Sequence, residues 1–164
     1  NFVRRLPQDW KWALELRHLA WFDGTAAQQE LDELLIERDI SRIVLDTRPL
    51  HAVPAVSSAA TEEKGNKPDL PITLDAVGSR PIIRVIGEDS PQGTMKGLLK
   101  WVPKLISWLD QGREPYVFVH QPENLDSPGL ARAIHTAVSM QYPAVAPLPE
   151  APAVEEPEQT SIFE

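Results

Sequence analysis

No cysteine occurs in the chain, which excludes disulfide bonds, zinc sites built on cysteine and thiol nucleophiles. Basic residues are outnumbered, because 16 Lys and Arg stand against 24 Asp and Glu and give a net charge of −8. A surface that is negative as a whole does not hold nucleic acid or an anionic membrane, so such contacts need a local basic patch. Long apolar runs are also lacking, and the first residues do not form a signal peptide. We therefore expect a cytoplasmic protein without a membrane partner.

Composition divides the chain into a folded part and a tail. With 164 residues, 42% of them hydrophobic, the length suffices for one domain with a core. Five of the 16 prolines fall between Pro143 and Pro157, and no Lys or Arg follows Arg132. A segment rich in Pro and Glu that lacks apolar periodicity does not fold by itself. We predict a domain over residues 1–142 and an extended or disordered tail over 143–164.

Four short apolar runs predict β-strands at 12–18, 42–48, 81–87 and 115–120. Their β-branched and aromatic residues are nearly continuous, which is typical of parallel strands covered on both faces. Strands that alternate with helical segments predict an α/β fold with a parallel sheet.

Helical patterns lie between and after these strands. Thr25 with Gln28 forms a capping box, and Ser127 precedes a proline at the start of the last helix, as an N-cap does. An apolar stripe over 98–109 predicts another helix, which Pro103 kinks or restarts.

The segment 52–71 interrupts this rhythm and is predicted to be a long loop, with a short accessory strand at 72–77 after it. Four parallel strands with helices make either half of an eight-stranded barrel or one small open sheet. A half-barrel leaves two strand edges unpaired. Either more chain precedes Asn1 or a second copy supplies the other half, and we expect the first.

Charged side chains lie at or near the end of every predicted strand. Parallel α/β proteins bind ligands where strands deliver their carboxyl ends. If the strand faces that carry these residues turn inward, a single pocket gathers all of them: Glu15, Arg17, Asp46, Arg48, Arg84 and His120.

Three arginines against two carboxylates leave one guanidinium, together with His120, for an external anion. The planar guanidinium suits phosphate or carboxylate, so we expect an anionic small molecule or a phosphate group as partner. Glu15 or Asp46 is the candidate general base, and His120 the candidate acid or base. The alternative is a ladder of ion pairs that only fills a barrel interior. Both carboxylates and the imidazole are acceptable metal ligands, but the arginines compete for the carboxylates, and we assign no metal and no cofactor.

Several spaced motifs then carry a resemblance: ELRH from Glu15, RIVLDTRPLH from Arg42, IRVIG from Ile83 and YVFVHQPEN from Tyr116. In this order they resemble the YecE-like family, the bacterial "domain of unknown function 72". The resemblance implies a TIM-type (β/α)8 barrel of roughly 250 residues, of which this chain is the C-terminal half. It adds His18 and Asn124 to the candidate ligand-binding residues, and it implies a site location but no reaction.

The tail ends in a pattern that looks like the short motif for binding the bacterial sliding clamp. Gln159 is followed by two small polar residues and then by Ile162 and Phe163. An extended leader lets such a peptide reach a partner, although five-residue patterns also recur by chance.

Two functions from different classes therefore stay open. The first is an enzyme: a barrel that binds a phosphate-bearing ligand, with a hydrolase in nucleic-acid metabolism as its specific form. The second is a non-catalytic adaptor, whose tail docks on a partner such as the sliding clamp. The acidic net charge favours small ligands over long duplex DNA.

Overall fold

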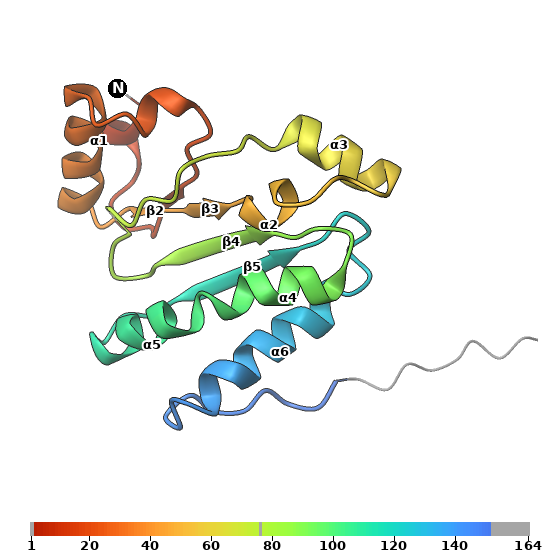
Figure 1. The fold of residues 1–164 in the computed structure, drawn as a ribbon. Helices are drawn as coiled ribbons and strands as arrows, with labels where there is room; N and C mark the ends of the chain where they lie inside the picture. Colours follow the sequence, from red (N-terminus) through yellow and green to blue (C-terminus); the bar gives the residue numbers. More distant parts are fainter. Residues whose placement is uncertain (1, 76, 152–164) are drawn as a thin grey trace, which may run out of the picture.

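The computed structural model describes residues 2–75 and 77–151, in which parallel strands alternate with helices (Figure 1). Five strands are present in this part of the chain: β1 (Ala13–Leu14), β2 (Ser41–Arg42), β3 (Val44–Asp46), β4 (Ile82–Ile86) and β5 (Tyr116–His120). The α-helices are α1 (Ala26–Glu37), α2 (Arg48–His51), α3 (Ser58–Asn66), α4 (Pro91–Leu99), α5 (Val102–Asp110) and α6 (Ser127–Ser139). Two 3-10 turns, Val3–Arg5 and Leu19–Trp21, precede α1.

Strands that are successive in the chain are also neighbours in space. β1 pairs with β2, β3 with β4 and β4 with β5, all in parallel. Only Ile43 separates β2 from β3, and its N–H donates to the carbonyl of Leu14 at 2.9 Å. The predicted α/β fold with parallel strands is confirmed.

The strands are shorter than predicted. The run 12–18 contributes only the two residues of β1, and the run 42–48 ends at Asp46 because Arg48 already begins α2. Pro49 suits that first helical turn, since its ring fixes φ and its missing N–H has no partner there. No accessory strand forms among the described residues of 72–77.

The predicted long loop 52–71 contains a helix. Ser57 starts it as an N-cap, with Oγ accepting a hydrogen bond from the N–H of Ala60 at 2.9 Å. Ala60 is the one residue of α3 that is buried, so this helix is held by polar contacts more than by a core. Ser57 is the sequence signal that could have revealed α3, but we did not recognise it as a cap when we predicted a loop.

The residues that we took as signals of helix starts do lie at or next to the first residues of helices. Thr25 caps α1 by accepting from the N–H of Gln28, as predicted. Pro103 lies in the first turn of a fresh helix, α5, so the apolar stripe is shared by α4 and α5. The last helix begins one residue earlier than predicted, with Ser127 as its first residue rather than its cap.

The two faces of the sheet differ. Val44, Ile83 and Val85 face the helices and form the main core with residues of α4, α5 and α6. The register pairs Leu45 with Arg84 and Arg84 with Phe118, so these three residues share the opposite face, which we call the open face. Phe118 is 55% exposed, because the described part of the chain places no helix over it.

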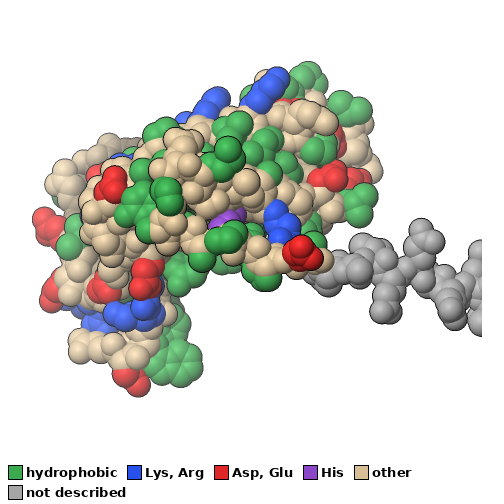
Figure 2. Space-filling view, turned by 90° about the horizontal axis from the view of Figure 1, so that it is seen from below, with side chains coloured by type: hydrophobic (Ala, Val, Ile, Leu, Met, Phe, Trp, Pro, Cys, Tyr) green, Lys and Arg blue, Asp and Glu red, His purple; other side chains and the backbone are tan. Residues whose placement is uncertain are grey.

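Residues 143–151, predicted to belong to the tail, pack along α6. Val145 contacts the main core, and Arg132 donates to the carbonyl of Pro149 at 2.7 Å. Viewed from this side, the surface carries many hydrophobic side chains (Figure 2). Within the residues described here, no helix has the length and apolar character needed to cross a membrane.

Candidate functional site

The central feature of the open face is a carboxylate shared by two arginines. Arg84, in the middle of β4, donates from Nη1 to both carboxylate oxygens of Glu15, at 3.2 and 3.1 Å. Arg17 binds Oε1 of the same carboxylate at 2.7 Å. Glu15 follows β1. Its contact with Arg84 therefore joins the end of β1 to β4, across the segment that contains β2 and β3. Two positive charges meet one negative charge here, which leaves a surplus positive charge on the open face.

The two arginines also set the protonation state of Glu15. Burial raises the pKa of its carboxyl, but the hydrogen bonds and charges of Arg84 and Arg17 outweigh burial and hold that pKa below its usual value. Glu15 is therefore ionised at neutral pH and is a poor proton acceptor. Its geometry suits the orientation of two guanidinium groups, not the general-base role we predicted.

His120 lies on the same face, at the carboxyl end of β5. The register pairs it with Ile86, two residues beyond Arg84, which is about 7 Å along a strand. Its Nε2 lies 3.3 Å from Oε1 of Glu63 on α3. Lys67 reaches the other oxygen of Glu63 at 3.5 Å. The carboxyl end of the open face thus carries a second ionic group, beneath α3.

Glu63 and Lys67 are site residues that sequence reasoning missed. We placed both in a loop, where their spacing has no structural meaning. On a helix, residues four apart are neighbours, so Glu63 and Lys67 form an i, i+4 pair. Recognition of Ser57 as a cap would have revealed the pair. Figure 1 shows α3 at the end of the sheet toward which the strands point.

Asp46 does not join this group, and the prediction of one shared pocket is wrong in this respect. The register pairs Asp46 with Val85, whose side chain packs in the helix-side core, whereas Leu45 pairs with Arg84. Side chains alternate along a strand, so Asp46 and Arg84 lie on opposite sides of the sheet. The sequence indicated the alternation within each strand, but not which face of β3 turns toward the helices.

On the helix side, Asp46 is 1% exposed, and both of its carboxylate oxygens accept hydrogen bonds. Arg48 donates to it from Nε and Nη2, each at 2.8 Å, and Trp101 donates from Nε1 at 2.7 Å. Burial raises the pKa of the Asp46 carboxyl, but the bonds from Arg48 and Trp101 hold it below the usual value. The hydrogen bonds to Asp46 raise the pKa of Arg48 in turn. Asp46 therefore acts as an ionised anchor between β3, α2 and the residue before α5, not as a free base.

The remaining predicted residues lie at the surface or outside the described part. His18 is exposed and caps the turn Leu19–Trp21, with Nδ1 accepting from the N–H of Ala20 at 3.2 Å. Asn124 is exposed in the loop after β5, with a positive φ of 56°. Gln159, Ile162 and Phe163 lie outside the described residues.

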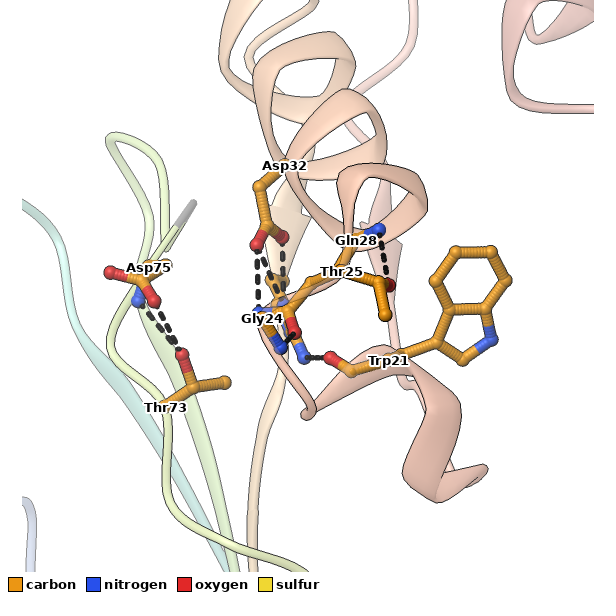
Figure 3. Close-up of polar contacts among 8 residues, drawn as sticks. Trp21, Gly24, Thr25, Gln28, Asp32, Thr73 and Asp75 are labelled. Carbon is orange, nitrogen blue, oxygen red and sulfur yellow. Dashed lines mark hydrogen bonds and ion pairs between the residues drawn. The ribbon is translucent and has the colours of Figure 1, made fainter.

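A buried ion pair, which we did not predict from the sequence, holds α1 against β2, the strand that pairs with β1. Arg42 of β2 is 1% exposed and donates to both oxygens of Asp32 on α1, at 2.7 and 3.0 Å. Its Nη2 donates to the carbonyl of Trp21, and Gln28 donates to Asp32 (Figure 3). This network ties α1 to β2 and to the turn that follows β1. Among the described residues, no group of three His, Asp or Glu side chains is arranged to hold a metal ion.

Comparison with known proteins gives relatives that are longer than this chain. The UPF0759 protein YecE of Escherichia coli strain K12 is 29% identical over 163 residues, and that of Escherichia coli O157:H7 is 28% identical. These alignments cover 99% of this chain and 58% of each relative, so the chain spans little more than half their length.

Crystal structures of a DUF72 family protein from Enterococcus faecalis V583 share the fold. One matches with a TM-score of 0.55 at 14% identity, covering 80% of this chain and 49% of that one. The second matches with a TM-score of 0.53 at 12% identity. The family described as "Protein of unknown function DUF72" matches residues 1–156. Because that match extends over nearly the whole sequence, this chain belongs to the DUF72 family.

Proposed function

We propose that this chain is half of a TIM-type barrel that binds a phosphate-bearing ligand at the carboxyl ends of its strands. The observation that carries the proposal is the surplus positive charge at Glu15, where Arg17 and Arg84 share one carboxylate. A guanidinium held in place by a carboxylate is preorganised for an anion, since its orientation costs little entropy on binding.

Half of a barrel accounts for the two different ends of the open face. From its amino end to its middle, β5 presents uncovered aromatic side chains: Tyr116 is 48% and Phe118 55% exposed. The ionic groups begin at Arg84, which pairs with Phe118 at mid-strand, and continue to His120 and Glu63 at the carboxyl end. In a closed barrel, further strands cover the apolar end and remove the unpaired edges of β1 and β5, while the ionic end stays open to ligands.

Roles within the proposed site follow from the contacts. Arg84 and Arg17 bind the phosphate oxygens, and Glu15 holds the two guanidinium groups in place. His120, in contact with the carboxylate of Glu63, is the side chain suited to proton transfer, because an imidazole beside a carboxylate is a common acid–base pair. In this proposal the pair takes over the general-base role for which Glu15 and Asp46 were the first candidates.

The test is a phosphate titration of the full-length protein, followed by the backbone amide signals of Phe118 and His120 in nuclear magnetic resonance spectra. We expect saturable shifts in the natural protein and at least tenfold weaker binding in Arg84→Gln. The matched control is Arg80→Gln, because Arg80 is paired with Glu114 at the amino end of the same strand. That variant should bind phosphate as the natural protein does.

Arg84→Gln leaves Glu15 with one partner, so its fold must be checked by circular dichroism. If it does not fold, Arg17→Gln tests the same site, since Arg17 is exposed and its loss leaves Arg84 on the carboxylate. Equal phosphate affinity in the natural protein and in the folded variant overturns the proposal. So does the lack of any saturable shift in the natural protein.

A further inference from the structure

A separate cavity of about 330 Å³ lies on the helix side of the sheet, between α2 and α4. Five of its ten lining residues are charged: Asp46, Arg48, Glu88, Lys96 and Lys100. Asp46 and Arg84 lie on opposite sides of the sheet, so this cavity is distinct from the site on the open face. We propose that the cavity is a second anion site, which binds a small phosphate-bearing molecule through Arg48, Lys96 and Lys100.

Arg48 is held in position for such a ligand. Its Nε and Nη2 are bound to Asp46, and its guanidinium lies over the ring of Trp101, 5.7 Å from the ring centre. This pairing leaves Nη1 on the side away from Asp46, and the side chain is 52% exposed. A guanidinium fixed on one edge and open on the other is preorganised to bind an anion.

The two lysines supply charge that the described part of the chain does not neutralise. Lys96 lies in the last turn of α4 and Lys100 is its C-cap, four residues further on, a spacing at which like charges repel. Neither has an ion-pair partner among residues 2–75 and 77–151. An unpaired basic cluster stands out in a chain whose net charge is −8.

Of the two acidic residues in the wall, Asp46 is already occupied. Asp46 is bound by Arg48 and Trp101. Glu88 lies against the first turn of α4, in space that is free because residue 93 is glycine. A carboxylate is stabilised at that end of a helix. The wall therefore carries three positive charges against two carboxylates, which leaves a net positive charge for a ligand.

Close packing makes the cavity a fixed feature of the fold. A Cβ at Gly97 would lie 2.5 Å from Cγ of Pro49, so α4 and α2 approach more closely than any other residue type permits. Both helices are also anchored to the sheet, α2 through Arg48 on Asp46 and α4 through Thr94, which bonds to the loop after β4. A ligand would thus enter an existing space.

The experiment is a phosphate titration of the full-length protein, followed by the amide signals of Gly93 and Gly97. We expect saturable shifts of both signals. In the double variant Lys96→Gln and Lys100→Gln, we expect at least tenfold weaker binding. The control double variant is Lys11→Gln and Lys104→Gln, which removes the same charge from positions outside the cavity and should leave the affinity unchanged.

Three results overturn the inference: shifts that do not saturate by roughly 10 mM phosphate, tenfold above a millimolar dissociation constant; unchanged affinity in the Lys96 and Lys100 variant; or equal shifts with acetate at the same concentration. Binding at the open face is read from Phe118 and His120 instead. A failure at one site is therefore distinguishable from a failure at the other.

Discussion

The indole Nε1 of Trp101 donates a hydrogen bond of 2.7 Å to Oδ2 of Asp46, 55 residues earlier in the chain. Both side chains are buried, at 4% and 1% exposure. This bond connects the end of β3 to the residue just before α5. It also explains how a carboxylate is tolerated in the helix-side core, since the remaining charge is met by Arg48.

We expect Trp101→Phe to reveal the strength of this bond. A hydrogen bond to a charged group contributes about 1.5–3 kcal/mol, and the variant also leaves a buried carboxylate with one partner fewer. Trp108→Phe is the control, because Trp108 is equally buried in the same core and loses a similar volume. Urea unfolding should show a larger loss of stability for Trp101→Phe. Equal losses would mean that the bond contributes nothing beyond ring packing.

Acid should destabilise the protein through Asp46. The folded-state pKa of this carboxyl lies below its ordinary value of 3.8, so its contribution to stability is complete above that pH and is lost as the pH falls through the folded-state pKa. Glu15 acts in the same direction, from its ordinary value of 4.5 downward. The free energy of unfolding, measured in urea from about pH 6 to about pH 3, should fall less steeply in Asp46→Asn than in the natural protein. Parallel curves would contradict the pKa direction.

The buried pair of Asp32 and Arg42 should be sensitive to the loss of one partner. Arg42→Met leaves the Asp32 carboxylate buried and unpaired, which costs about 3–5 kcal/mol in comparable pairs. Combining it with Asp32→Leu should recover most of that loss, because apolar replacement of both partners is often neutral. The exposed pair of Arg80 and Glu114 is the control, and Arg80→Ala should change the unfolding free energy far less than Arg42→Met does. A double variant no more stable than Arg42→Met would count against this account.

Asp89 should determine how firmly α3 is held. Its carboxylate accepts from the N–H groups of Val56 and Ser57 and from the Ser57 hydroxyl, at the start of the helix. These bonds lower the pKa of Asp89, the Ser57 hydroxyl contributing most. We expect Asp89→Ala to increase amide hydrogen exchange over α3 severalfold with little change in global unfolding. Asp75→Ala, at another exposed aspartate in a loop, should leave this exchange unchanged.

The clamp-binding motif stays a prediction from the sequence. Replacing Ile162 and Phe163 with Ala should abolish association of the full-length protein with purified sliding clamp, because the motif buries this pair. Replacing Thr160 and Ser161 with Ala is the matched control, since both are small and are not expected to enter a pocket. Clamp binding that survives the first double variant would remove the adaptor hypothesis.

The sequence alone was sufficient for the alternation of the main strands and helices and for their parallel arrangement, although α2 and α3 were missed. Runs such as 81–87 and 115–120 are too short and too continuously apolar for surface elements, and Thr25 and Pro103 mark helix starts by chemistry that acts within one turn. These signals are local, so no knowledge of distant residues is needed. The candidate residues Glu15, Arg17 and Arg84, whose side chains meet in the structure, were likewise chosen because of their charge in or near predicted strands.

Tertiary structure decided which charged groups meet. A strand has two faces, and only packing against α4 and α5 determines that Asp46 turns toward the helices while Arg84 turns away. The partners that hold Asp46 and His120 in place, Trp101 and Glu63, lie 55 and 57 residues away in the chain. No sequence spacing encodes such contacts. They follow from burial, which forces each charged group on the core side to find a partner and leaves the charges of the open face available to a ligand.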